Sequence, residues 1–167
     1  GCAGYSEDCL QLNAYVPRST ARRGEPLPVM VWIHGGCFVS GRASSYNGTE
    51  LAVTQDVIVV TISYRLGAFG HLGHDALRSR DPSEGSTGNY GLQDAVAALR
   101  WLSDNVGALG GDPSRVTIFG ESSGAGTVSQ LLGYEASWPF WSRAILESGA
   151  AAFWTQMPML AAYHAFD

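Results

Sequence analysis

One serine, Ser122, stands where a serine can do chemistry, in the stretch Gly120-Glu121-Ser122-Ser123-Gly124. An apolar run at residues 116–119 precedes this stretch and a predicted helix follows it, so the motif lies at a strand-to-helix turn. A serine hydroxyl held clear of a sheet at such a turn can be activated by a base as a nucleophile. Only Ser122 has a glycine two residues before it and two residues after it, where the crossing strand and helix leave no room for side chains. The alternative interpretation is a glycine-rich strand-to-helix turn whose serine has no catalytic role.

The elements that would position this serine follow from the hydrophobic pattern. Apolar runs and one alternating segment predict strands over residues 10–16, 29–33, 57–62, 116–119 and 143–146. The runs at 29–33 and 57–62 are typical of strands buried on both faces. Apolar spacing and capping signals predict helices over residues 49–55 (with Thr49 as N-cap), 92–105 and 123 to about 132. Segments rich in Gly, Pro, Ser or His predict loops and turns at residues 18–28, 39–47, 63–91 and 110–113.

Alternating strands and helices predict an α/β fold, with a mostly parallel sheet and helices on both of its faces. Active sites of such open sheets lie beyond the carboxyl ends of the strands. Three glycine-bearing segments, residues 34–38, 63–70 and 120–124, are expected to meet there. With 167 residues, the chain makes at most one domain with a real core.

Composition excludes several classes of function. The net charge is −5 and the ten basic residues are all Arg, so binding to nucleic acid has no electrostatic support. No apolar run approaches the roughly 20 residues that a membrane span needs. The chain begins with Gly1 and shows no signal-peptide pattern, which predicts that it was cut from something longer.

Five motifs together resemble the carboxylesterase type B family, the cholinesterase-like serine hydrolases of the α/β-hydrolase fold. In chain order these motifs are Ser6-Glu7-Asp8-Cys9-Leu10-Gln11-Leu12-Asn13, His34-Gly35-Gly36-Cys37-Phe38, Ser63-Tyr64-Arg65-Leu66-Gly67-Ala68-Phe69-Gly70, Asn89-Tyr90-Gly91-Leu92-Gln93-Asp94 and Phe119-Gly120-Glu121-Ser122-Ser123-Gly124. The resemblance runs from Ser6 to Gly149. It implies a serine esterase or lipase that acts on a small-molecule carboxylic ester through an acyl-serine intermediate and needs no cofactor or metal.

The resemblance implies that Ser122 is the nucleophile and that backbone N–H groups of Gly35, Gly36, Cys37 and Ser123 form the oxyanion hole. Fixed donors there stabilise the charge of the tetrahedral intermediate, and losing one typically costs about 2.7–4 kcal/mol. The chain departs from the family at Cys37, where a small residue is usual, and at Ser123, where Ala is usual. Cys37 retains its N–H group, but its thiol must point away from the substrate. Since the N–H group of Ser123 is the needed one, the sequence predicts little effect from that change.

Other matched positions have implied supporting roles. Glu121 is implied to shape the pocket electrostatically, with a plain surface charge as the alternative. Arg65 and Asp94 match a buried ion pair of the family. We interpret both residues as structural, because one partner alone would be a costly buried charge. Cys9 matches a half-cystine whose partner lies upstream in the family, and Cys2 is an alternative partner if the backbone folds back sharply.

The triad is incomplete, because the fold needs Ser, then Asp or Glu, then His in chain order, and only 45 residues follow Ser122. The histidines His34, His71, His74 and His164 are poor candidates for the base, and Asp167 ends the chain. The resemblance therefore implies that residues 1–167 are one partial catalytic domain, inactive alone, that lacks the C-terminal part with the acid and the histidine. A non-catalytic cholinesterase-like adhesion or binding module and an inactive truncated product are the alternatives.

Localisation rests on two features. The Cys9 motif and the glycosylation sequon Asn47-Gly48-Thr49 together predict a secreted or extracellular protein from an oxidising compartment. The ester's acyl and alcohol parts and the oligomeric state are not predicted.

Overall fold

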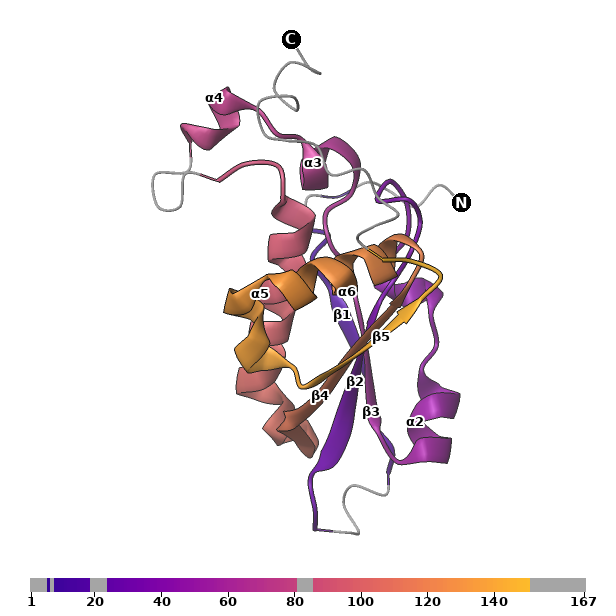
Figure 1. Ribbon diagram of the computed structural model, residues 1–167. Coiled ribbons are helices and arrows are strands. Elements are labelled where there is room, and N and C mark those ends of the chain that lie inside the picture. Colours follow the sequence, from indigo (N-terminus) through magenta and orange to yellow (C-terminus); the bar gives the residue numbers. More distant parts are fainter. Residues whose placement is uncertain (1–5, 7, 19–23, 81–85, 151–167) are drawn as a thin grey trace.

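A five-stranded mixed sheet forms the centre of the computed structural model, which describes residues 6, 8–18, 24–80 and 86–150 (Figure 1). Its strands are β1 (Leu12–Tyr15), β2 (Leu27–Ile33), β3 (Ile58–Ile62), β4 (Gly111–Glu121) and β5 (Arg143–Glu147). Their order across the sheet is β1-β3-β2-β4-β5. Only β1 runs antiparallel to its neighbour, so the mostly parallel α/β sheet expected from the sequence is confirmed.

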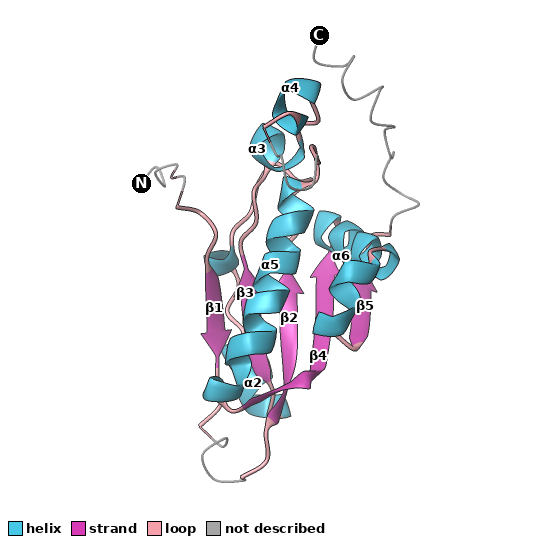
Figure 2. Cartoon of the chain, turned by 90° about the vertical axis from the view of Figure 1, so that its left-hand side faces the viewer, coloured by secondary structure: helices cyan, strands magenta, loops and turns pink. Residues whose placement is uncertain are grey.

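Helices lie on both faces of this sheet. They are α2 (Thr49–Gln55), α3 (Gly67–His71), α4 (Asp75–Arg78), α5 (Tyr90–Asn105) and α6 (Ser123–Gly133), with 3₁₀ turns η1 (Ala43–Ser45), η2 (Val106–Leu109) and η3 (Glu135–Phe140). Helices α5 and α6 cover one face of the sheet and α2 lies on the other (Figure 1), and Figure 2 looks onto the face that α5 covers. Within the described ranges, no helix combines the length and the apolar character that crossing a bilayer needs.

The core forms between the sheet and helix α5. Every second residue of β2 is buried on this face, and Val29, Val31 and Ile33 pack with Leu99 and Leu102 of α5. Burying each such side chain stabilises the fold by about 1.5–3 kcal/mol. All five residues of β3 are buried, as expected, but β2 is fully buried on one face only, since Met30 and Trp32 stay half-buried.

Three details of the elements differ from the sequence expectations. The N-cap of α2 is Gly48 and not Thr49, because the Asn47 side chain accepts the Thr49 N–H at 3.0 Å and helix geometry begins there. Residues 63–91 are not one long loop, since they contain α3 and α4 and the first residues of α5. The turn expected at residues 110–113 is shorter, because Gly110 turns in the left-handed region at φ 80° and β4 begins at the next residue.

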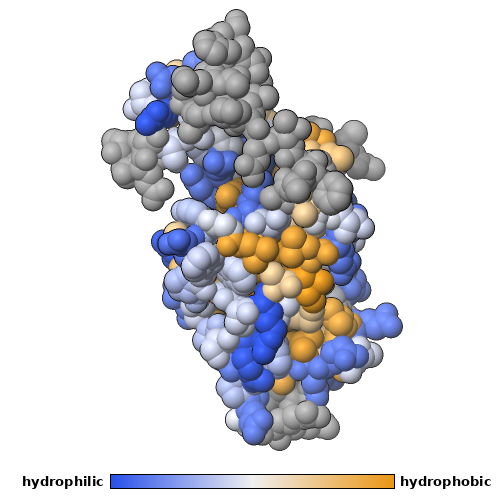
Figure 3. All heavy atoms as spheres, in the orientation of Figure 1, coloured by the Kyte–Doolittle hydropathy of each residue, from blue (hydrophilic) through white to orange (hydrophobic). Residues whose placement is uncertain are grey.

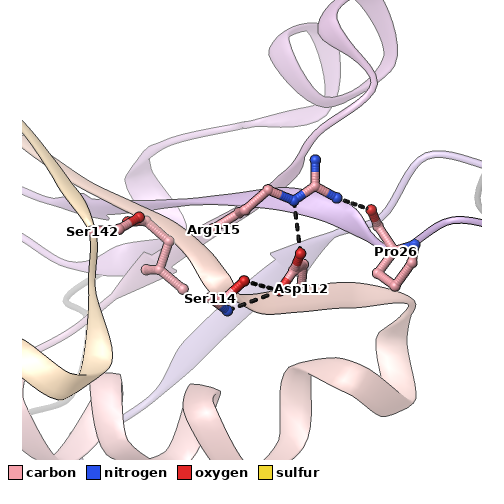
Figure 4. Close-up of polar contacts among 6 residues, drawn as sticks. Pro26, Asp112, Ser114, Arg115 and Ser142 are labelled. Atoms are coloured by element: carbon pink, nitrogen blue, oxygen red, sulfur yellow. Dashed lines mark hydrogen bonds and ion pairs between the residues drawn. The ribbon is translucent and has the colours of Figure 1, made fainter.

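The start of β4 is tied to the segment that leads into β2. The Arg115 guanidinium bonds the Asp112 carboxylate at 2.7 Å and reaches the carbonyl oxygen of Pro26 (Figure 4). Hydrogen bonds from Ser114 and the ion pair with Arg115 lower the pKa of Asp112 to about 2. Because the cluster spans two neighbouring parallel strands, it fixes the amino-terminal side of the sheet, opposite the predicted site.

Strand β5 lies at one edge of the sheet. Its only paired neighbour among the described residues is β4, with Phe119 opposite Ile145 and Glu121 opposite Glu147. Apolar residues gather over β5 and the adjoining part of α6 (Figure 3), and Ile145 and Leu132 remain 42% and 43% exposed.

Candidate active site

The turn between β4 and α6 has the strained geometry expected of the Gly120–Gly124 motif. Ser122 lies between the two elements with φ 55° and ψ −123°, a conformation that few non-glycine residues adopt. Its N–H donates to the Glu147 carbonyl at 2.9 Å, and its carbonyl accepts the Gly126 N–H at 3.0 Å. These bonds on both sides hold the Ser122 side chain at the carboxyl edge of the sheet, where it is half-buried.

Close packing explains both glycines of the turn. A Cβ on Gly120 would lie 2.6 Å from the Gly124 carbonyl carbon, and a Cβ on Gly124 would lie 2.0 Å from the Ile33 carbonyl oxygen. Neither position admits a side chain without moving backbone. The steric reason deduced from the sequence therefore agrees with the packing of the turn.

The loop at residues 34–38, which follows β2, packs directly against this turn. A Cβ on Gly35 would lie 3.1 Å from the Ser122 Cβ, so only glycine lets the loop come this close. Gly36, Cys37 and Phe38 follow with φ of 121°, 55° and 61°. Three successive residues in the left-handed region make a strained turn that bends the backbone around the serine.

Free backbone donors gather next to Ser122. The N–H groups of Gly36 and Cys37 make no hydrogen bond with any residue that the structure describes. Ser123 is the first residue of α6, so helix geometry leaves its N–H without an intrahelical acceptor. The positive end of the α6 dipole lies at the same place.

Cys37 and Glu121 flank these donors. The Cys37 side chain is exposed and its thiol is free, so it does not fill the space between the loop and Ser122. Glu121 is exposed, and a Cβ on Gly35 would lie 2.9 Å from its Oε2 atom. A negative charge therefore borders the donor cluster.

None of the described histidines bonds the Ser122 hydroxyl, which has no hydrogen-bond partner among the described residues. His34 is fully buried, with Nδ1 2.8 Å from the Gly35 carbonyl oxygen, so Nδ1 carries the hydrogen. Burial lowers the pKa of His34 and of His71 and so favours the neutral form of each imidazole. His74 caps α4 by accepting the Ala76 N–H at 3.1 Å, and His164 lies outside the described residues, as do Asp167 and Cys2.

Arg65 and Asp94 form the expected ion pair. The guanidinium makes two hydrogen bonds of 2.7 Å to the carboxylate, and the Arg65 N–H adds a third of 3.0 Å. The expectation of a buried pair needs correction, because the Asp94 side chain is 5% exposed but that of Arg65 is 37% exposed. Cys9 is a free, exposed thiol in the described part of the chain, so its disulfide stays a prediction.

Sequence reasoning missed two contacts of the site. The Ser123 hydroxyl, fully buried, accepts the Phe38 N–H at 3.3 Å, and the Tyr64 hydroxyl donates to the His34 carbonyl at 2.6 Å. These partners are 85 and 30 residues apart, so no local spacing signals them. Tyr64 stood inside a family motif, which was the only available hint.

An open cavity of 470 Å³ lies beside the loop, lined by Phe38, Val39, Gly67, Ala68, His71 and Leu72. Its lining is mostly apolar. No group of His, Cys, Asp or Glu side chains in the described ranges could hold a metal ion.

Comparisons with known proteins point the same way as this geometry. The model of the Carboxylesterase family matches residues 2–164. The chain is 50% identical to liver carboxylesterase 1 of Oryctolagus cuniculus over 147 residues, covering 88% of this chain and 25% of that protein. It is 44% identical to para-nitrobenzyl esterase of Bacillus subtilis (strain 168) over 153 residues, covering 90% of this chain and 30% of that protein.

A solved structure of a thermophilic PNB esterase superimposes with a TM-score of 0.76 at 44% sequence identity. The match covers 87% of this chain and 29% of the esterase chain. The chain thus spans between a quarter and a third of the length of the relatives that it matches.

Proposed function

The chain belongs to the carboxylesterase family, and from this premise we propose that it is the N-terminal part of a serine esterase that hydrolyses carboxylic esters through an acyl-Ser122 intermediate. The observation that carries the proposal is the contact between Gly35 and Ser122, which brings the free N–H groups of the 34–38 loop next to a strained, half-buried serine. A nucleophile beside fixed donors is what acyl transfer requires.

In this mechanism the Ser122 hydroxyl oxygen attacks the ester carbonyl carbon, and its proton passes to a general base. The carbonyl oxygen becomes an anion, which accepts hydrogen bonds from the N–H groups of Gly36, Cys37 and Ser123, while Gly35 allows the approach. Collapse of the tetrahedral intermediate releases the alcohol with a proton and leaves an acyl-Ser122 ester. Water then attacks this ester, releases the carboxylic acid and restores the serine.

The base and its acid partner belong, in this proposal, to the part of the protein beyond the described residues. His34 is buried and His71 is half-buried, and burial favours the neutral form of both, but neither bonds the Ser122 hydroxyl. The exposed apolar surface along β5 also supports a domain that continues past this chain, since a sheet edge of this kind is normally covered. Glu121 borders the donors and would tune the charge of the pocket.

The decisive experiment uses the full-length esterase that carries this chain. Ser122→Ala should abolish both the burst of alcohol from a short-chain aryl ester and labelling by a fluorophosphonate probe. Ser114→Ala, at the opposite end of the same strand, is the matched control and should keep both. Activity that survives Ser122→Ala would refute the proposal, and a full-length protein that neither hydrolyses esters nor takes the probe would favour a binding module or an inactive product.

We further propose that the protein is secreted through an oxidising compartment. Asn47 is exposed in the loop before α2, and Cys9 is exposed near the start of the described chain, so both are accessible for modification. Expression in a secreting eukaryotic host should give a product whose mass falls on treatment with an N-glycosidase, and Asn47→Gln should remove this fall. A natural full-length sequence with no signal peptide would contradict secretion.

A further inference from the structure

The two ends of the 34–38 loop are tied to the body of the protein by buried hydroxyl groups on other elements. At one end, the Phe38 N–H donates to the Ser123 hydroxyl at 3.3 Å. At the other end, the His34 carbonyl accepts from the Tyr64 hydroxyl at 2.6 Å. Ser123 begins α6 and Tyr64 follows β3, so each anchor comes from a segment already fixed by the sheet.

The direction of each bond follows from the groups involved, because a carbonyl oxygen can only accept and an N–H group can only donate. Tyr64 gives its single hydroxyl hydrogen to the His34 carbonyl, and the Ser123 oxygen accepts the Phe38 N–H.

The result is two separate anchors, one at each end of the same loop. Ser123 is fully buried and Tyr64 is 4% exposed. Burial raises the pKa of Tyr64 to about 12 and the neighbouring Ser123 side chain opposes this only in part, so the phenol keeps its hydrogen at any working pH.

Ring packing adds to the hold on the loop. The Tyr64 ring stacks on the His34 ring with centroids 4.5 Å apart and planes 20° apart. A loop with three successive residues in the left-handed region keeps that conformation only where its surroundings over-determine it. The two hydroxyls supply this constraint at the two loop ends, on either side of the N–H groups of Gly36 and Cys37.

We propose that the hydroxyls of Ser123 and Tyr64 hold the two ends of the 34–38 loop against the Ser122 turn, and that these two side chains are therefore positioning residues for ester hydrolysis. The inference rests on the proposed function, since it concerns the donors of the oxyanion hole. It revises the sequence expectation for Ser123, whose hydroxyl now has a role besides that of its N–H group. Displacing catalytic donors by an ångström is enough to slow a reaction severely.

The test compares Ser123→Ala, Tyr64→Phe and the double variant in the full-length esterase. Each single variant should lower kcat for a short-chain aryl ester about threefold to tenfold, the loss expected from one buried hydrogen bond, with KM within about twofold. Affinity for an aryl trifluoromethyl ketone, whose Ser122 adduct carries an oxyanion, should fall by the same factor. The double variant should lose more than either single variant, because it releases both ends of the loop.

The matched control is Thr127→Val, which removes an equally buried hydroxyl from the same helix. Thr127 bonds only the Ser123 carbonyl, at 3.2 Å, and does not reach the loop. Its kcat and ketone affinity should match those of the parent, even if its melting temperature falls.

Either of two results would overturn the proposal: unchanged kcat and ketone affinity in both single variants, or an equal loss in Thr127→Val. Ser123→Ala removes a single oxygen atom and carries the test alone if Tyr64→Phe does not fold. If the Ser122→Ala variant is inactive while Ser123→Ala and Tyr64→Phe are fully active, only the positioning role is refuted. If the Ser122→Ala variant is active, the proposed function itself is refuted.

Discussion

Gly124 of α6 packs against the Ile33 carbonyl at the end of β2 so closely that a Cβ on Gly124 would lie 2.0 Å from that oxygen. This contact fixes how deeply the helix sits over the sheet. Since the atom in the way is backbone, neither side can yield by rotating a side chain.

We therefore expect Gly124→Ala to destabilise the protein by at least about 3 kcal/mol, through forced displacement of α6 or β2. Gly133→Ala, at the other end of the same helix, has nothing within 4 Å of the added methyl and should be neutral or stabilising by up to about 1 kcal/mol. Denaturant unfolding of both variants checks this. Similar losses in the two variants would show that the contact with Ile33 is not the cause.

Asp94→Ala should cost about 1.5–3 kcal/mol, because it removes a carboxylate that accepts three hydrogen bonds from Arg65. This is less than the about 3–5 kcal/mol of a fully buried pair, since the Arg65 side chain is 37% exposed and water can solvate it. Thermal melts of the full-length protein provide the measurement. Asp112→Ala, which breaks the more exposed pair with Arg115, should lower the melting temperature less.

Stability should fall as the pH drops below about 6.5. Burial lowers the folded-state pKa of His34, and its hydrogen bond to Gly35 opposes this only in part. The unfolded chain therefore takes up a proton near pH 6.5 while the folded chain does not, and each such histidine costs up to about 1.4 kcal/mol per pH unit. The pKa of His71 is lowered by burial as well.

Melting temperatures between pH 7.5 and pH 5 test this expectation. His34→Gln and His71→Asn should each flatten the acid side of the profile. A parent whose melting temperature is constant down to pH 5 would mean that these imidazoles take up protons in the folded state.

The chain of residues 1–167 alone should react with a fluorophosphonate probe very slowly or not at all, whereas the full-length protein should be labelled at Ser122 within minutes. The described histidines do not bond the Ser122 hydroxyl, and without a base the serine keeps its proton. Mass spectrometry of the labelled peptide gives the measurement. Rapid labelling of the isolated chain would reveal a base among its own histidines.

Much of the fold follows from local pattern. The continuous apolar runs of β2 and β3 and the apolar spacing of α5 predicted these elements to within a few residues, since burial of a strand or a helix face dictates residue type over a short window. The Ser122 turn was predictable for a similar reason. Both positions that must lack a side chain, Gly120 and Gly124, lie within five residues, so a short stretch of sequence is enough to predict the turn.

Other features depended on contacts that no window of sequence contains. The half-exposed state of Arg65 and the place of β5 at the edge of the described sheet follow from what lies nearby in space. The bonds from Phe38 to Ser123 and from Tyr64 to His34 are the clearest case, because they join segments at the ends of three strands. The residue types alone determined that a serine would stand at a sharp turn beside glycine-rich backbone. Only the packing of the parallel strands, which brings their carboxyl ends together, decided which hydroxyls would hold that backbone in place.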